Sequence, residues 1–237
     1  MPNPYFQFKQ FTIYHDRCAM KVGTDGVLLG AWTDVSDARY VLDIGTGTGL
    51  IALMIAQRNS NATIDAIDID TDAIVQSAEN VGESPFASRI QCVEKSLQDL
   101  VSYPLKKYDA IISNPPFFIE SLKSPHQGRT LARHADSLPV EDLISISSRL
   151  LSERGKLSVI YPCDYKNILV SLAGQNNLFV SRITNVFPTP SSVSKRILVE
   201  LSKNELPLVE TDLLIEKERH VYSDEFTALV KDFYLKM

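Results

Sequence analysis

The sequence predicts an α/β protein built on a doubly wound, mostly parallel sheet. Short apolar segments at 40–44, 63–68, 90–94 and 108–113 each predict a buried strand. Helical patterns separate the first three, and strands that alternate with helices form a parallel sheet covered on both faces. The 237 residues, 44% of them hydrophobic, are enough for one large domain with a sizeable core.

Two helices are expected between these strands, near 49–58 and 71–80. Beyond Pro139, apolar residues recur at helical spacing and predict a third helix that ends at 154–155. The residues on its apolar face are Val140, Leu143, Ile144, Ser147, Leu150 and Leu151. A strand at 156–161 and a further helix near 164–175 extend the alternation.

The remaining segments predict smaller additions to this sheet. Residues 5–14 are rich in aromatic side chains and partly alternating, which indicates a small N-terminal β element whose rings belong to the core. Strands at 179–187 and 196–201 form an antiparallel hairpin at the sheet's edge and complete seven strands. Ser223, followed by two acidic residues and an apolar stripe, is the expected N-cap of a C-terminal helix.

A glycine turn joins the first strand of the sheet to its helix. Its sequence is Gly45-Thr46-Gly47-Thr48-Gly49, and glycines let the backbone pass close to a ligand at the carboxyl edge of a parallel sheet. Asp43 precedes the turn by two residues and suits a cationic ligand better than a pyrophosphate. Asp68 ends the next strand, where a carboxylate meets ribose hydroxyls. Either acid alone is better explained as a cap or a solvated charge, but in this order they predict a nucleoside site.

The strand at 108–113 ends in the loop Asn114-Pro115-Pro116-Phe117. Two prolines fix φ and remove two donors, so carbonyl oxygens, one carboxamide and one aromatic ring remain. Such a loop can accept hydrogen bonds from a planar amine and stack its base, which is worth roughly 1–3 kcal/mol. The alternative is that this segment is only a turn that ends the strand. The presence of the glycine turn in the same sequence makes that interpretation less favoured.

These segments resemble a known enzyme class. Residues 41–57, Asp68 and residues 113–117 are similar to motifs I, II and IV of class I S-adenosylmethionine-dependent methyltransferases, and the Asn-Pro-Pro-aromatic loop is similar to that of amino-group methylators. Residues 21–32, 129–134 and 233–235 resemble the YfiC-type valine tRNA adenine-N6 methyltransferases of bacteria. The resemblance implies a Rossmann-like fold and one methyltransferase domain over 1–237. In that domain 1–35 is an N-terminal element and cofactor-lining segment, 36–203 the catalytic core and 204–237 a C-terminal extension.

The resemblance also implies roles for individual residues. Asn114, Pro115, Pro116 and Phe117 are the expected catalytic residues, and Phe118 is a second aromatic wall. The expected contacts of S-adenosylmethionine are Lys21, Gly23, Thr24, Asp25, Asp43, Gly45, Thr46, Gly47, Gly49, Asp68, Ile69, Ser96 and Leu97.

Among these contacts, Asp43 favours the cofactor's ammonium directly or through water, Asp68 takes the ribose hydroxyls, and Ile69 stacks on the adenine. Ser96 stands where many relatives carry the acid that reads the adenine amino group, and Asp99 is its alternative. Thr24 or Asp25 is also expected to be the N-cap of a helix.

An RNA substrate requires local positive charge, although the net charge is −5. The residues expected to bind the substrate are Phe118, Arg129, Arg133, Lys195 and Arg196. Arg17, Lys21 and Lys123 extend the basic patches, and ordinary surface charge is an equally good explanation of each patch alone. The resemblance implies a tRNA anticodon loop, with adenine 37 of a valine tRNA as the target.

Other compositional features narrow the expected class. The sequence lacks a run of 18 apolar residues and a signal segment, so we expect a cytoplasmic protein with no membrane role. We also expect a monomer. Three separated cysteines and four scattered histidines argue against disulfides and a metal site.

Two alternatives to the leading function remain. One is a methyltransferase acting on another planar amine: guanine N2 in ribosomal RNA, adenine N6 in DNA or a release-factor glutamine. The other is a non-catalytic RNA-binding module.

Overall fold

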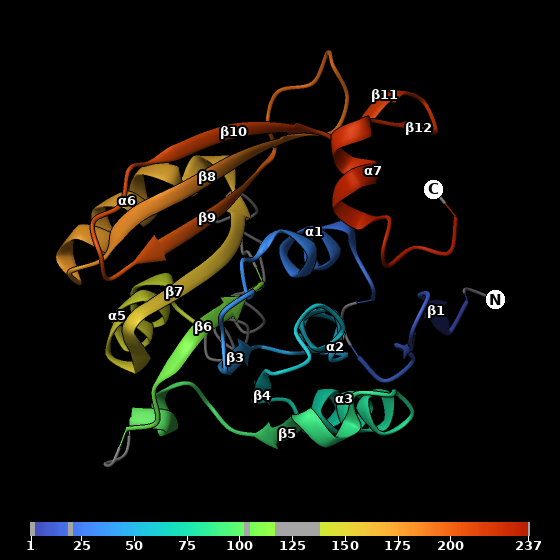
Figure 1. The fold of residues 1–237 in the computed structure, drawn as a ribbon, viewed down its shortest axis with the longest axis horizontal. Coiled ribbons are helices and arrows are strands. Elements are labelled where there is room, and N and C mark those ends of the chain that lie inside the picture. Colours follow the sequence, from blue (N-terminus) through green and yellow to red (C-terminus); the bar gives the residue numbers. More distant parts are fainter. Residues whose placement is uncertain (1–2, 19–20, 102–104, 117–137, 237) are drawn as a thin grey trace, which may run out of the picture.

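The computed structural model describes residues 3–18, 21–101, 105–116 and 138–236. Its core is an eight-stranded sheet with the order β10-β8-β9-β7-β6-β3-β4-β5 (Figure 1). Only β9 runs antiparallel to its neighbours, β7 and β8. The strands are β3 (Tyr40–Ile44), β4 (Thr63–Asp68), β5 (Ile90–Glu94), β6 (Tyr108–Ser113), β7 (Leu151–Pro162), β8 (Phe179–Phe187), β9 (Arg196–Ser202) and β10 (Val209–Leu214).

Helices cover both faces of the sheet, as expected for a doubly wound fold (Figure 1). One face carries α1 (Thr24–Trp32), α2 (Leu50–Arg58), α3 (Thr71–Gly82) and α7 (Asp224–Val230), and the other carries α5 (Val140–Leu150) and α6 (Lys166–Gln175). Successive strand residues enter opposite cores: Val41 belongs to the core that contains residues of α2, whereas Leu42 belongs to the core that contains residues of α5 and α6. Three short 3-10 helices complete these layers: η1 (Ala87–Arg89), η2 (Gln98–Val101) and η3 (Cys163–Tyr165).

Two sequence-based expectations about this sheet are wrong. The sheet has eight strands rather than seven, because β10 pairs in parallel with β8 from Val209↔Arg182 to Leu214↔Phe187. The β8–β9 hairpin therefore lies one strand inside the edge. The third expected helix ends at Leu150 rather than at 154–155, because Leu151 already pairs with Tyr108 as the first residue of β7.

The two ends of the described chain pack together on the α7 side of the sheet (Figure 1). The expected N-terminal element is a hairpin of β1 (Tyr5–Gln7) and β2 (Thr12–Tyr14), and Phe8 between them is buried. Its ring stacks on that of Tyr234, with centroids 5.9 Å apart. The expectation that the rings of this segment belong to the core is therefore right for Phe8 and Phe11, which are buried, and wrong for Tyr5 and Tyr14, which are 41% and 37% exposed.

The C-terminal segment adds a hairpin of β11 (Glu216–Glu218) and β12 (Val221–Tyr222) before α7. The expected N-cap is confirmed, since Ser223 Oγ accepts a hydrogen bond from the Phe226 amide at 3.0 Å. Phe226 and Val230 are buried in the core that also contains α1. No helix in the part of the chain described here is long and apolar enough to span a membrane.

Candidate active site

The glycine turn after β3 is held against the end of β4. Gly45, Gly47 and Gly49 have φ values of +69°, +54° and +80°, which side-chain-bearing residues adopt only under strain. The amides of Gly45 and Thr46 donate to the Ile67 carbonyl at 2.9 and 3.0 Å. The Gly47 amide donates to Asp68 Oδ2 at 2.9 Å, so the turn and the second predicted acid form one unit.

Asp43 lies beneath this turn with no exposed surface. Its Oδ2 accepts from Thr46 Oγ1 at 2.7 Å and from the Ala52 amide at 3.2 Å, so the carboxyl holds both the turn and the first turn of α2. Oδ1 has no hydrogen-bond partner among the described residues. Burial, with a smaller contribution from the charge of Asp68, raises the pKa of Asp43 to about 7.

This structural role of Asp43 was not foreseen from the sequence, although a threonine three residues after an aspartate is a readable signal for a local hydrogen bond. Of the two expected routes to a cofactor ammonium, the one through water agrees better with such complete burial.

The nucleoside half of the site lies around the end of β4. Asp68 is half-buried, and its Oδ1 accepts from the Asp70 amide at 3.1 Å. Ile69 leaves 54% of its surface exposed, as an apolar platform for a base requires. Burial, followed by the charge of Asp68, raises the pKa of Cys18 to about 11.

Ser96 and Asp99 form a mutual hydrogen-bonded pair at the start of η2. Ser96 Oγ donates to Asp99 Oδ2 at 2.6 Å, and the Asp99 amide donates to Ser96 Oγ at 3.2 Å. These bonds hold the pKa of Asp99 below its ordinary value. The two candidate readers of the cofactor's adenine are thus parts of one contact, with Leu97 buried between them in the chain.

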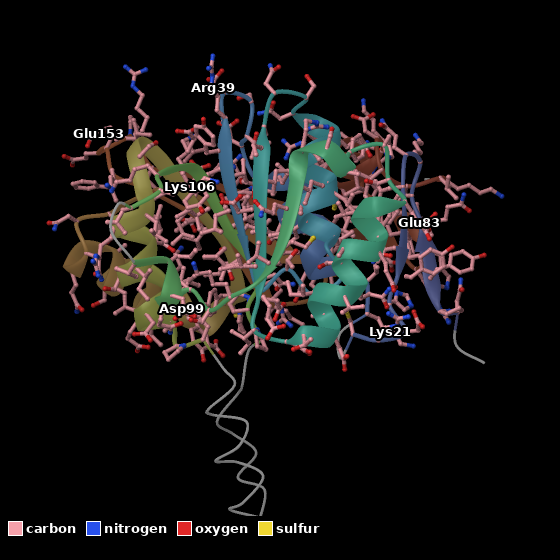
Figure 2. The ribbon with its side chains drawn as sticks, turned by 90° about the horizontal axis from the view of Figure 1, so that it is seen from below. Lys21, Arg39, Glu83, Asp99, Lys106 and Glu153 are labelled. Carbon is pink, nitrogen blue, oxygen red and sulfur yellow. The ribbon has the colours of Figure 1, made fainter. Side chains whose placement is uncertain are left out.

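Figure 2 shows that Asp99 and Lys21 lie at one end of the sheet, opposite Arg39 and Glu153. Arg39 immediately precedes β3, so Asp99 and Lys21 are at the carboxyl edge of the parallel strands. This is the edge at which open α/β sheets bind ligands.

The proline loop enters the same edge beside the glycine turn. Ser113 Oγ donates to the Ile44 carbonyl at 3.0 Å, which fixes the end of β6 to the residue before Gly45. Asn114 is half-buried, Pro115 is buried and Pro116 is exposed. The four other expected residues of this region, Phe117, Phe118, Arg129 and Arg133, lie outside the described residues, as does Lys123.

Helix α1 brings its first turn to Asn114. A methyl group on Gly26 would lie 3.1 Å from Leu50 Cδ2 and 3.8 Å from Asn114 Nδ2, so the starts of α1 and α2 meet near the Asn114 carboxamide. The expected N-cap is wrong: the N-cap is Gly23, which has no side chain, and Thr24 and Asp25 already belong to the helix.

The two neighbouring basic residues at the start of β9 have different surroundings. Arg196 Nε donates to Asp25 Oδ2 at 2.8 Å, which joins an expected substrate-binding residue to an expected cofactor-lining one. Lys195 is exposed, as is Lys21. Arg17, which extends the basic patches in the sequence, forms an ion pair with Glu79 at 2.7 Å.

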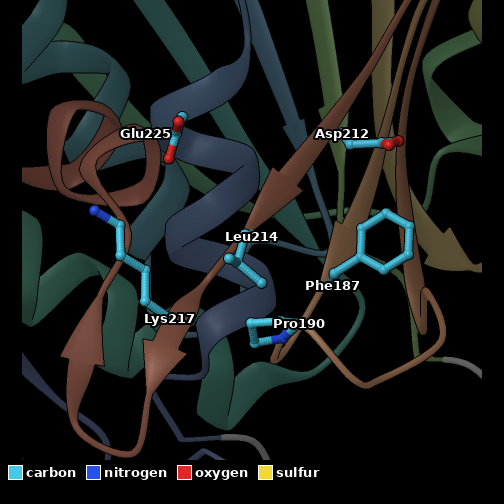
Figure 3. A pocket seen from close by; sticks show the side chains of 6 residues that line it. All are labelled: Phe187, Pro190, Asp212, Leu214, Lys217 and Glu225. Carbon is cyan, nitrogen blue, oxygen red and sulfur yellow. The ribbon is translucent and has the colours of Figure 1, made fainter.

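A separate pocket of about 430 Å³ lies between the end of β8, β10, β11 and α7 (Figure 3). Its lining residues are Phe187, Pro190, Asp212, Leu214, Lys217 and Glu225. Lys217 pairs with Asp224, and Asp212 accepts from Asn185, so these two charged side chains are engaged in local contacts. None of the residues predicted for the site lines this pocket.

The described residues contain no group of three or more His, Cys, Asp or Glu side chains placed to hold a metal ion. Cys18, Cys92 and Cys163 are free thiols.

A parallel sheet with a glycine turn after one strand and a carboxylate after the next defines the class of α/β proteins that bind a nucleoside cofactor at this edge. Comparison with known proteins identifies the group within that class. The sequence model of the methyltransferase small domain matches residues 22–177. The chain therefore belongs to the methyltransferase small domain family, and it is an enzyme of the methyltransferase class.

Curated relatives extend the similarity to the whole chain. It is 52% identical to the tRNA1(Val) (adenine(37)-N6)-methyltransferase of Parabacteroides distasonis over 238 residues, covering 100% of both chains. A protein of the same name from Trichodesmium erythraeum is 51% identical, with 98% of each chain covered.

Solved structures share the fold at low sequence identity. A predicted O-methyltransferase from Agrobacterium tumefaciens has a TM-score of 0.68 at 19% identity, covering 88% of this chain and 96% of that one. A 16S rRNA N2 G1207 methyltransferase from T. thermophilus, in complex with AdoMet and guanosine, has a TM-score of 0.56 at 15% identity, covering 86% and 52%.

Proposed function

We infer that this chain transfers a methyl group from S-adenosylmethionine to the N6 amino group of an adenine in tRNA, with adenine 37 of a valine tRNA as the target. The substrate is that of the full-length relatives at about half identity. The structural observation that carries the chemistry is the placement of Asn114 beside the first turns of α1 and α2, next to the glycine turn.

The residues present suit this cofactor. Left-handed glycines leave the backbone of the turn open to a ligand, Asp68 stands where ribose hydroxyls are expected, and Ile69 offers an exposed apolar surface to the adenine. The unpartnered Oδ1 of Asp43 is an acceptor that a cationic amino group satisfies through water. When bound, S-adenosylmethionine supplies an electrophilic methyl group on its sulfonium sulfur.

The protein's contribution is to align the target amine and to raise its nucleophilicity. We assign acceptance of the two amino N–H bonds to the Asn114 side-chain oxygen and the Pro115 carbonyl. Both favour a pyramidal nitrogen with an available lone pair. The N–CH₃ bond would form as the bond between the methyl carbon and the sulfonium sulfur breaks, and one amino proton would then leave to solvent. Holding the nitrogen in line with the methyl group replaces a bimolecular encounter by a positioned one.

The target base must leave a base stack to reach Asn114. An anticodon loop already presents unstacked bases, whereas extracting a paired base costs a few kcal/mol. We place the first phosphate contact at the exposed Lys195, with Lys21 as a second cation at the same edge. Phe117 and Phe118 as aromatic walls and Arg129 and Arg133 as RNA contacts complete the proposal, as do a monomeric state and action in the cytoplasm.

The test is transfer of labelled methyl from S-adenosylmethionine to total tRNA that lacks its own modifications, followed by nucleoside mass analysis. We expect label in N6-methyladenosine. Label that appears only with ribosomal RNA, DNA or a release factor would keep the chemistry and overturn the substrate. No transfer to any of these would favour a non-catalytic RNA-binding module.

The matched variant is Asn114→Ala. We expect it to bind S-adenosylmethionine with the wild-type dissociation constant, measured by calorimetry, and to lose about 100-fold or more in kcat, as loss of a positioned polar group in a transition state does. Transfer at the wild-type rate would remove Asn114 from the mechanism.

A further inference from the structure

One ion pair connects the first turn of α1 to the start of β9. Arg196 Nε donates to Asp25 Oδ2 at 2.8 Å, across 171 positions of the sequence. The two side chains are 35% and 30% exposed, so the contact is only partly screened by water. Arg196 Nη1 also donates to the Lys195 carbonyl at 3.1 Å, which aligns the guanidinium with its own backbone.

The first turn of α1 has few other restraints. Its N-cap is Gly23, which provides no side-chain hydrogen bond, and the Val27 amide reaches the Gly23 carbonyl at 3.3 Å. Thr24 is exposed, and burial of the helix begins only at Gly26. A carboxylate in this turn is favoured by the helix dipole, but the dipole does not fix its position. The fixed partner is Arg196.

Arg196 is well placed to serve as an anchor. It belongs to β9, where it pairs with Pro162 of β7 on one side and with Val186 of β8 on the other. The residue after Asp25 is Gly26, whose surroundings include both Leu50 and Asn114. A displacement of Asp25 is therefore transmitted directly to the helix surface that meets the catalytic carboxamide.

We propose that Arg196 is a positioning residue that holds the first turn of α1 beside Asn114 through its ion pair with Asp25. The pair links the loop between β8 and β9, which ends in Lys195, to the geometry of methyl transfer. Its effect on transfer rests on the proposed function. Arg196 is a weaker phosphate ligand than Lys195, because Asp25 already offsets its charge.

A double-mutant cycle tests this proposal with Asp25→Asn, Arg196→Gln and the combination. Each single variant should lower kcat about 3- to 10-fold, as expected for loss of one charge-assisted hydrogen bond, with KM for tRNA within about twofold of wild type. Because both changes break the same contact, the combined variant should lose no more than either one. Arg196→Lys, which keeps the charge, should recover part of kcat. Lys195→Gln, at the neighbouring residue that we place in contact with RNA, is the matched comparison and should raise KM for tRNA.

Two results would overturn the proposal. One is multiplication of the two losses in the combined variant. The other is a rise in KM alone for Arg196→Gln, which would make Arg196 an RNA contact like Lys195.

The same double-mutant cycle is also measured by calorimetry for the binding of S-adenosylmethionine without RNA. We expect the two single variants and the combined variant to weaken this binding equally. If the wild-type protein methylates no tRNA, the proposed function fails, whereas this binding cycle still decides whether Asp25 and Arg196 act as one contact. Additive weakening, or none, would reject the positioning role in either case.

Discussion

The buried carboxyl of Asp43 makes folding stability depend on pH in an unusual direction. Burial raises its pKa from an ordinary value of 3.8 to about 7, so the folded protein binds a proton that the unfolded chain releases. Below pH 3.8 both states are protonated and the group has no effect. As the pH rises from about 4 to about 7, ionisation favours the unfolded chain, and stability is lost.

The size of this effect follows from the two pKa values. At 1.36 kcal/mol per pH unit, the difference between 3.8 and about 7 corresponds to about 4 kcal/mol when the titration is complete. Between pH 5 and pH 8 the same two values give a loss of about 2–3 kcal/mol in the free energy of unfolding. Asp43→Asn removes the titration but keeps an oxygen that can accept from Thr46 or Ala52.

The assay is urea unfolding of the wild type and Asp43→Asn at pH 5, 6, 7 and 8 without cofactor, with the free energy taken from linear extrapolation. The wild-type value minus the variant value should fall by about 2–3 kcal/mol across this range. Any effect of the substitution on the free energy of unfolding that does not depend on pH cancels when the differences at the four pH values are compared. A difference that stays level with pH would refute the argument that Asp43 is buried with one unpartnered oxygen.

Asp109→Asn is the control for this titration. Burial raises the pKa of Asp109, but hydrogen bonds from the Tyr40 and Arg39 amides and from Ser152 outweigh it, and the net pKa is lowered. The ionised Asp109 carboxylate therefore stabilises the folded protein above pH 3.8, and this contribution is lost only as the pH falls below that value. Between pH 5 and pH 8 the difference between wild type and Asp109→Asn should therefore stay level.

Three further substitutions test separate parts of the structure. Asp68→Asn should raise the dissociation constant of S-adenosylmethionine about tenfold in calorimetry, because a charged acceptor that also holds the Gly47 amide is lost; unchanged affinity would remove Asp68 from the site. Gly49→Ala should lower the free energy of unfolding, measured in urea, by about 1–3 kcal/mol, because φ is +80° and the new methyl would lie 3.2 Å from Ser77 Cβ. Gly82→Ala is the control and should leave the free energy of unfolding unchanged, because the space around Gly82 is open. Ser223→Ala should cost about 1 kcal/mol through loss of the cap on Phe226 and leave kcat at 25 °C unchanged; a loss of kcat at full stability would contradict a purely structural role for α7.

The sequence predicted the central strands closely for a definite physical reason. The bounds of β3, β4, β5, β6 and β8 agree with the expected segments. For β3 and β6 the reason is that strands buried on both faces are nearly continuous apolar runs. The strand β10 was missed since four of its six residues are exposed, and charged residues interrupt its apolar pattern. Its pairing with β8 is a tertiary contact that no local pattern contains.

The same distinction separates the site residues that were foreseen from those that were not. The glycine turn with Asp68 and the proline loop are short segments whose chemistry can be recognised locally, and the fold brings them to one edge. Contacts between distant segments, such as that of Gly26 with Asn114, depend on the packed fold. The assignment of Lys195 and Arg196 to one basic patch overlooked Asp25 for the same reason.

The position of Asp43 connects the stability of the fold with cofactor binding. An isolated carboxylate in such a buried place is costly, and replacing it by an apolar residue would remove the cost, but it would also release the amides and hydroxyl that shape the turn. The unpartnered Oδ1 is the part of this arrangement that the fold itself does not need. In the proposed function, an acceptor without a partner among the described residues is available to a cationic ligand, and the stability that the fold gives up near neutral pH would be recovered as binding free energy when a donor reaches this oxygen.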